Sequence, residues 1–101
     1  MNWLTYIETE LKRVLPNQHP GRTRTIARRI AGIALRELYH SSSEDFLHLL
    51  HQAEKDTTVP EAVRLAAGRL AARLDANFNS PSVEPINDAM SIVEFVKKER
   101  A

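Results

Sequence analysis

Residues 23–40 of the chain read TRTIARRIAGIALRELYH and include its longest apolar run, Ile30 to Leu35. If this stretch is a helix, its apolar side chains cover about 200° of the circumference at 100° of rotation per residue. These side chains are Ile26, Ala27, Ile30, Ala31, Ile33, Ala34, Leu35 and Leu38. A helix with so wide an apolar arc needs neighbours on several sides, so we expect it at the centre of the fold.

The rest of the chain also follows helical periodicity. Ser42 or Ser43 is expected to cap one further helix, since a hydroxyl accepts a hydrogen bond from the free amides of a first turn. Thr58 and Glu61 have the order of a capping box, with Pro60 early in the first turn, where its missing N–H costs little. Around the central helix we therefore expect helices at about residues 3–15, 46–55, 58–78 and 86–98.

The overall prediction is an all-α fold. The segment His19-Pro20-Gly21 separates the first helix from the central one, because proline removes a backbone donor. Residues 91–96 are rich in β-branched side chains, so a strand stays open as an alternative there. A chain of 101 residues has room for one core. We expect a single helical domain over residues 1–101, built as a compact bundle of four to five short helices.

The chain has no cysteine and three glycines. The lack of thiols excludes disulfides, thiolate catalysis and cysteine-ligated metal. Glycine at positions 21, 32 and 68 alone cannot form a Walker loop or a dinucleotide-binding turn, because both need clustered glycines. We therefore predict no enzymatic activity and no cofactor. Gly32 and Gly68 lie inside predicted helices, where glycine costs about 1 kcal/mol against alanine, so both indicate tight packing.

The net charge is +1, but residues 11–36 contain seven Lys and Arg and no acid. An arginine strip on the central helix could hold the phosphates of a nucleic acid, because guanidinium groups match phosphate oxygens. Its candidate residues are Arg22, Arg24, Arg28, Arg29 and Arg36. The alternative is that Glu44, Asp45 and Glu54, in or beside the next helix, neutralise the strip within the fold. Nucleic-acid binding is therefore our second functional hypothesis.

The spacing of Glu44, His48 and His51 is i, i+4 and i+7, which would place the three side chains on one helical face. A metal ion would need a further ligand, which His40 or His19 would have to supply. Without that complete shell these are polar side chains on the exposed side of a helix, and the spacing is not that of the H-E-x-x-H motif. We predict no metal site.

Residues 46–74 resemble a single HEAT-repeat hairpin. Arrays of such hairpins bury their faces by stacking at least three units, and one unit is recognisable here, so we predict no array and assign no family. The resemblance consists of the pair Leu49-Leu50, an acidic turn, and Val63-Arg64 followed by Ala66-Ala67 and Leu70.

The helix expected at 58–78 has a second apolar stripe, away from its main buried face, formed by Leu65, Ala72 and Ala76. An uncovered stripe of this kind marks an interface with a protein partner or with a second copy in a homodimer. The alternative is that the last helix covers it within a compact bundle.

The chain begins without the positive start and apolar stretch of a signal peptide, and its longest apolar run is far too short to span a membrane. We therefore expect a cytoplasmic protein that does not bind membranes. The functional prediction is a small non-enzymatic protein-interaction or regulatory module, with self-association as one form of that interaction.

Overall fold

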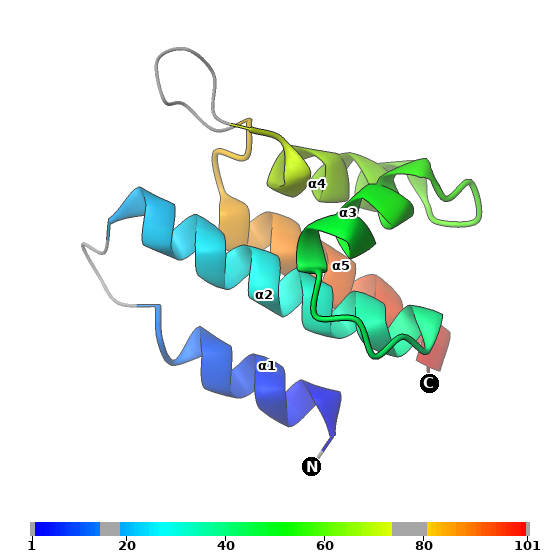
Figure 1. The fold of residues 1–101 in the computed structure, drawn as a ribbon, viewed down its shortest axis with the longest axis horizontal. Helices are drawn as coiled ribbons and strands as arrows, with labels where there is room; N and C mark the ends of the chain where they lie inside the picture. Colours follow the sequence, from blue (N-terminus) through cyan, green and yellow to red (C-terminus); the bar gives the residue numbers. More distant parts are fainter. Residues whose placement is uncertain (1, 15–18, 74–80, 101) are drawn as a thin grey trace.

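The computed structural model describes residues 2–14, 19–73 and 81–100. In these ranges all regular structure is helical and no strand occurs, which confirms the predicted all-α fold. None of the helices in the same ranges has the length and apolarity needed to cross a bilayer. The described helices are α1 (Trp3–Leu11), α2 (Pro20–Tyr39), α3 (Phe46–Lys55), α4 (Glu61–Ala71) and α5 (Pro85–Arg100) (Figure 1).

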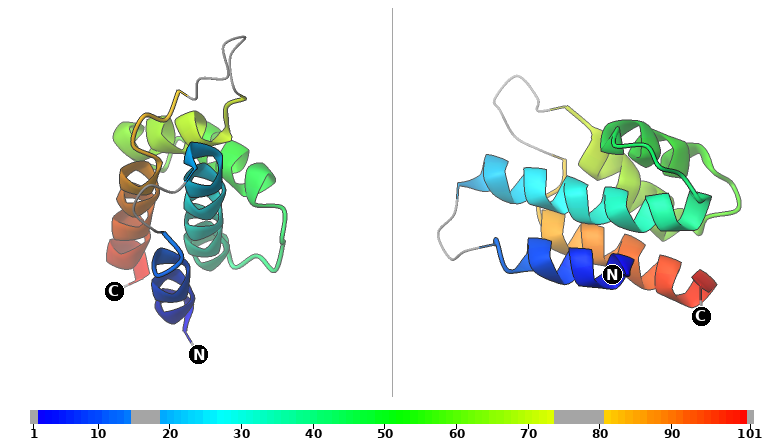
Figure 2. Two further views of the ribbon diagram at one scale, coloured as in Figure 1. Left: turned by 90° about the vertical axis from the view of Figure 1, so that its left-hand side faces the viewer. Right: turned by 60° about the horizontal axis from the view of Figure 1, so that its bottom comes forward.

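Helix α2 occupies the centre of the bundle. It contacts each of the other four helices, and Figure 2 shows α3 and α4 on one side of it and α1 on the other. Helix α5 lies alongside α2 and also packs on α4. The wide apolar arc predicted for this helix is confirmed, because α2 has neighbours nearly all round. Its buried residues are Ile26, Ala27, Ile30, Ala31, Gly32, Ile33, Ala34 and Leu35.

The first two helices begin and end differently from the prediction. Pro20 does not break the chain but is the first residue of α2, a position where the missing N–H would have no partner in any case. His19 caps the helix, because its Nδ1 accepts a hydrogen bond of 3.1 Å from the Gly21 N–H. Helix α1 ends at Leu11, earlier than expected, and residue 15 lies outside the described ranges.

The starts of α3 and α4 also differ from the predicted caps. Asp45, and not Ser42 or Ser43, caps α3 by accepting a hydrogen bond of 3.0 Å from the His48 N–H. Helix α4 begins at Glu61 with Pro60 at the cap position and no side-chain cap, while Thr58 donates to Asp56 instead. Helix α4 ends at Ala71, and the expected continuation to residue 78 lies outside the described ranges apart from residues 72 and 73.

Helix α5 includes residues 91–96, so the strand alternative is wrong. Its buried residues recur at the spacing of one helical face, which packs on α2 and α4. The β-branched side chains of this segment are tolerated because packing outweighs a small difference in propensity. The buried residues are Ala89, Ile92, Val93 and Val96.

Helix α3 packs against a glycine of a neighbouring helix near each of its ends. A Cβ atom at Gly32 of α2 would overlap the Phe46 side chain at the start of α3. A Cβ atom at Gly68 of α4 would lie 2.9 Å from Oε1 of Glu54, near the end of α3. Both glycines therefore mark the close packing that the sequence predicts, but one faces an aromatic ring and the other a flexible carboxylate.

Replacement of each glycine by alanine should change the free energy of unfolding differently at the two positions. Gly32→Ala is expected to lower the free energy of unfolding by about 1–3 kcal/mol, because overlap with the ring outweighs the gain in helix propensity. Gly68→Ala is expected to leave it unchanged or raise it by up to about 1 kcal/mol, because the Glu54 carboxylate can rotate away. Urea denaturation of both variants measures the difference, and equal effects would contradict this account of the packing.

Candidate functional site

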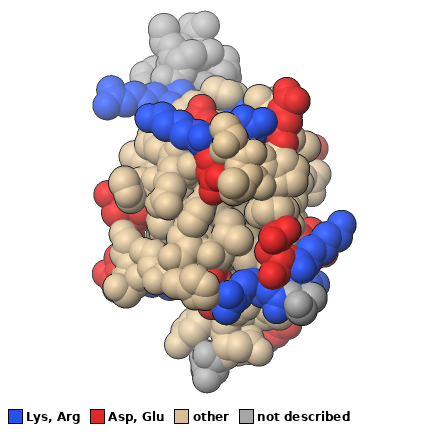
Figure 3. Space-filling model, turned by 90° about the vertical axis from the view of Figure 1, so that its right-hand side faces the viewer, with Lys and Arg blue, Asp and Glu red and all other residues tan. Residues whose placement is uncertain are grey.

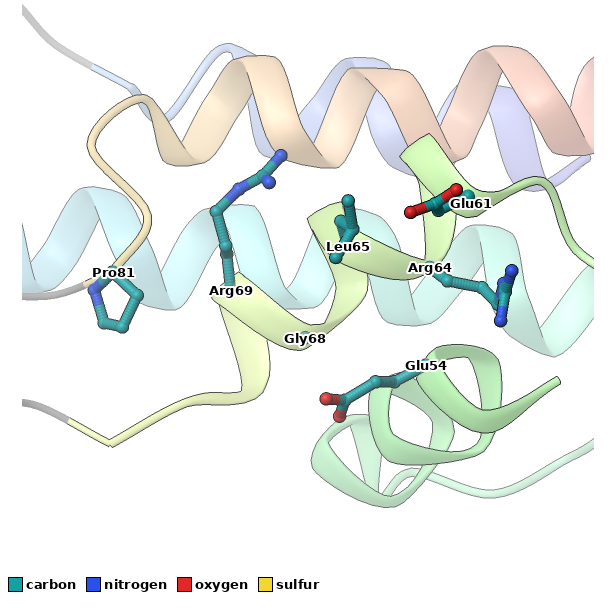
Figure 4. Close-up of a pocket in the computed structure, with 7 residues that line it drawn as sticks. All are labelled: Glu54, Glu61, Arg64, Leu65, Gly68, Arg69 and Pro81. Atoms are coloured by element: carbon teal, nitrogen blue, oxygen red, sulfur yellow. The ribbon is translucent and has the colours of Figure 1, made fainter. Parts of the chain in front are cut away.

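A groove of about 460 Å³ lies along the outer side of the α3–α4 pair (Figure 4). One residue comes from α3, five come from α4, and Pro81 closes one end. We call this site the α3–α4 groove. Its lining residues are Glu54, Glu61, Arg64, Leu65, Gly68, Arg69 and Pro81.

Leu65 is the apolar centre of the α3–α4 groove and is 54% exposed. It projects outward because the opposite face of α4 is buried in the core, through Val63, Ala66 and Leu70 among others. Glu61, Leu65 and Gly68 follow one another at i, i+4 and i+7 on this outer face. That spacing was the sequence signal for the groove, and the prediction used only its leucine.

The predicted stripe of Leu65, Ala72 and Ala76 is not a continuous helical row. Helix α4 ends at Ala71, so Ala72 lies beyond the last helical residue, and its carbonyl accepts a hydrogen bond of 3.0 Å from Arg28. Ala76 lies outside the described residues. Leu65 is thus the one residue of the predicted stripe that the structure places in the groove.

The guanidinium of Arg69 is turned toward α5 and held there by Asp88 (Figure 4). Two hydrogen bonds of 2.7 and 3.1 Å join the pair, and the Ser82 hydroxyl donates a third to Asp88 at 2.6 Å. Burial raises the pKa of Asp88, but the hydrogen bonds from Arg69 and Ser82 more than offset it and hold the pKa below its usual value. The positive charge of Arg69 is therefore already neutralised within the fold.

Arg64 extends from α4 away from Leu65, and its Nε is buried without a hydrogen-bond partner among the described residues (Figure 4). Its charge acts on Asp56 in the α3–α4 loop. Asp56 also accepts hydrogen bonds from the hydroxyls of Thr58 at 2.6 Å and Tyr39 at 2.7 Å. The Thr58 hydroxyl, the Tyr39 hydroxyl and the charge of Arg64 all hold the pKa of Asp56 below its usual value. Arg64 forms no ion pair with Asp56, and it lines the groove.

The charges that point into the α3–α4 groove are the carboxylates of Glu54 and Glu61, on either side of Leu65 and Gly68 (Figure 4). Oε2 of Glu54 lies 3.5 Å from Nδ1 of His51, a pair that is ionic only when the imidazole is protonated. In the part of the chain that the structure describes, Glu61 forms no ion pair. The groove is therefore apolar at its centre, with two carboxylates and the guanidinium of Arg64 at its edges.

The arginines predicted to form one strip on α2 contact different partners in the structure. Nε of Arg28 donates to the Leu70 carbonyl at 2.6 Å and so satisfies the free carbonyls at the end of α4. Arg29 forms an ion pair of 3.0 Å with Glu10 of α1, and the guanidinium of Arg36 lies 5.2 Å from the centre of the Phe46 ring. Burial, together with the charge of Arg24, lowers the pKa of Arg28.

The acids that neutralise the strip are not the ones predicted. Glu44, Asp45 and Glu54 form no ion pair with α2 within the described ranges, whereas Glu10 pairs with both Arg29 and Arg13. Glu10 is buried on α1, three residues after the buried Ile7. A carboxylate at that position on an otherwise apolar face was the sequence signal for a basic partner. Neither Arg22 nor Arg24 forms an ion pair with another described residue.

The four histidines do not come together: His48 and His51 lie one turn apart on α3, whereas His19 and His40 lie elsewhere. His48 and His51 are exposed on α3, but Glu44 precedes that helix, so the expected ligand spacing on one helical face is not formed. Nε2 of His40 lies 3.2 Å from Nη1 of Arg100, and His19 caps α2. The described residues contain no group of three side chains that could hold a metal ion.

Comparison of the chain with protein-family models, with curated proteins and with solved structures gives no match. The likeness of residues 46–74 to a HEAT-repeat hairpin therefore rests on the sequence pattern alone.

Replacement of Asp88 by Asn tests the contact that withdraws Arg69 from the groove. The variant is expected to lose about 1–2 kcal/mol of unfolding free energy at pH 7, because a hydrogen-bonded but half-exposed ion pair is removed. The lowered pKa of Asp88 means that its contribution is complete above about pH 4 and disappears as the pH falls below that value. Urea denaturation should therefore show the difference between wild type and variant shrinking toward about pH 2.

Glu94→Gln on the exposed face of α5 is the matched control, with an expected change below about 0.5 kcal/mol at any pH. A difference between Asp88→Asn and the wild type that persists unchanged in acid would contradict the assigned role of this carboxylate.

Proposed function

We propose that the chain is a small non-enzymatic protein-interaction module, and that its α3–α4 groove receives a segment of a partner protein. The observation that carries the proposal is Leu65, which is 54% exposed within a groove and not on a convex surface. An apolar side chain in a concave site, rimmed by polar groups, is typical of protein-binding surfaces.

The walls of the groove are supported by the core, which favours a preformed binding site. Behind Leu65, Ala66, Ala67 and Leu70 are at most 1% exposed. Arg69 and Asp88 join α4 to α5, and Glu54 lies against Gly68 to join α4 to α3. A preformed groove of this kind loses little entropy when it binds a partner.

The groups with shifted pKa values also favour an interaction role over catalysis. Asp88 and Arg69 bind each other, and Tyr39 and Asp56 likewise bind each other. Burial and then the hydrogen bond to Asp56 raise the pKa of Tyr39. Each of these shifts therefore has a structural cause within the described residues, and none of the four groups needs a substrate to explain its shift.

The same groove is accessible to a second copy of the chain, so a homodimer is one form of the proposed interaction. Sedimentation at increasing protein concentration separates this form from binding to a different protein. We keep the cytoplasm, expected from the sequence, as the proposed location.

Two matched variants test the use of the groove. Leu65→Glu is expected to abolish capture of the partner from an extract of the source cells, because it adds a third carboxylate at the centre of the groove. Leu47→Glu is the control, since Leu47 is 45% exposed on α3 and does not line the groove. Quantitative mass spectrometry of proteins retained by the wild type and by each variant is the measurement. Identical sets of retained proteins for all three would refute the proposal.

Nucleic-acid binding through Arg22, Arg24, Arg28, Arg29 and Arg36 stays the alternative proposal. Arg28, Arg29 and Arg36 each have a partner within the fold, which leaves the exposed Arg22 and the half-buried Arg24 as the remainder of the strip. Figure 3 shows the opposite end of the molecule from the start of α2, and on that face Lys and Arg side chains lie among Asp and Glu. These observations favour the protein-interaction role.

Fluorescence anisotropy with labelled DNA and RNA oligonucleotides tests the alternative. The expected result at physiological salt is no binding tighter than the non-specific range of about 10⁻⁴–10⁻⁶ M. Tighter binding that weakens steeply with salt and is lost in Arg22→Glu/Arg24→Glu would favour the nucleic-acid role instead.

A further inference from the structure

We infer that the occupant of the α3–α4 groove is a basic amphipathic helix of a different protein, with a leucine-like side chain flanked by arginine or lysine. This inference rests on the proposed function and adds the chemistry of the partner. It follows from the charges around Leu65, from the shape of the groove and from the surface of the chain itself.

Carboxylates outnumber guanidinium groups around the groove. Arg69 is paired with Asp88 and so does not offset the two carboxylates that point inward, which leaves Arg64 as the one cation of the lining without an ion pair among the described residues. With Arg69 neutralised by Asp88, the carboxylates of Glu54 and Glu61 and the guanidinium of Arg64 leave an excess of one negative charge in the lining. A cationic group placed near these carboxylates gains electrostatic energy without displacing an existing partner of Glu61 among the described residues.

The carboxylates flank the apolar centre and do not cover it. Glu61 lies one helical turn before Leu65 on α4, whereas Glu54 reaches Gly68 from α3. The lack of a side chain at Gly68 lets the Glu54 side chain lie against α4 there, beside Leu65. An apolar side chain can therefore contact the exposed Leu65 while basic residues one turn away on the same helix meet the two carboxylates.

The described surface of this chain offers no such segment, which argues against a second copy as the occupant. Its large exposed apolar side chains besides Leu65 are Tyr6, Leu47 and Val83. Val83 precedes Glu84, and Leu47 follows Asp45. One turn from Tyr6 toward the C-terminus lies Glu10, which already holds Arg13. None of the three has an unpaired lysine or arginine one turn away on both sides.

The test uses the full chain labelled with ¹⁵N and an alanine-based helical peptide of about 15 residues. The peptide has a central leucine with arginine four residues to either side, a spacing that places all three on one face. Titration at physiological salt is expected to shift the amide signals of Leu65 and Gly68 most. A peptide with glutamate in place of both arginines, and one with alanine in place of the leucine, are each expected to bind at least about tenfold more weakly.

Variants of the protein complete the test. Glu61→Lys is expected to weaken binding of the arginine peptide by about tenfold and Glu61→Gln by less, in the order of the charge removed. Glu8→Lys on the exposed face of α1 has the same charge change away from the groove and is expected to leave binding unchanged. Thermal unfolding of each variant shows that the fold is retained.

The inference is overturned if the arginine and glutamate peptides bind equally, if Glu61→Lys and Glu8→Lys behave alike, or if the shifts lie away from the groove. It is also overturned if no peptide binds while capture of a cellular partner still depends on Leu65, and in that case the proposed function stands. Loss of both results would refute the proposed function as well.

Discussion

The Phe46 side chain packs directly on the backbone of α2 at Gly32, and the position of α3 depends on this contact. Any Cβ atom at that point would push the ring, and with it the first turn of α3, away from the core. Helix α3 in turn packs on α4, where Glu54 meets Gly68. Glu54 and Phe46 lie near opposite ends of α3, so the contact of Phe46 with α2 helps to set the side of the groove that Glu54 forms. At Gly32 the ring meets the α2 backbone directly, because α2 has no side chain there.

Several charged side chains of this molecule form contacts that join one helix to another. Glu10 and Arg29 connect α1 to α2, Arg28 satisfies carbonyls at the end of α4, and Asp88 connects α5 to α4 through Arg69. Buried or half-buried charges need such partners, because an unpaired charge costs more than an exposed pair gains. The charged groups that have no such partner are therefore the ones that indicate what the surface could bind. Around Leu65 they are the carboxylates of Glu54 and Glu61, which define the chemistry of the groove.

Much of the fold could be predicted from periodicity, whereas the site could be predicted only in part. The buried face of α2 and the helical character of most of the chain follow from apolar spacing, a local property that repeats every turn. Helix ends were less predictable, since Pro20 is equally suited to interrupting a helix and to starting one, and Asp45 competes with two nearby serines for the cap of α3. Leu65 was identified as exposed, but its predicted companion Ala72 lies beyond the end of α4. Glu61 was not connected to it, although it lies four residues earlier on the same helix, and Glu54 could not be, because it comes from α3 and its distance from Leu65 depends on how the two helices pack.

The sequence by itself determined that this chain forms helices, that residues 23–40 form the central one, and that Gly32 and Gly68 allow close approach, because these properties depend on neighbours within a few residues. Only the tertiary structure decided which acid meets which arginine, and hence which charges stay unpaired. Pairing between helices depends on their relative positions, and residues such as Glu10 and Arg29, or Arg69 and Asp88, are 19 positions apart in the chain. Most arginines of the α2 stretch therefore hold the fold together, because packing gives them partners on other helices. Leu65, which lies in space between the side chains of Glu54 and Glu61, stays exposed and forms the candidate site.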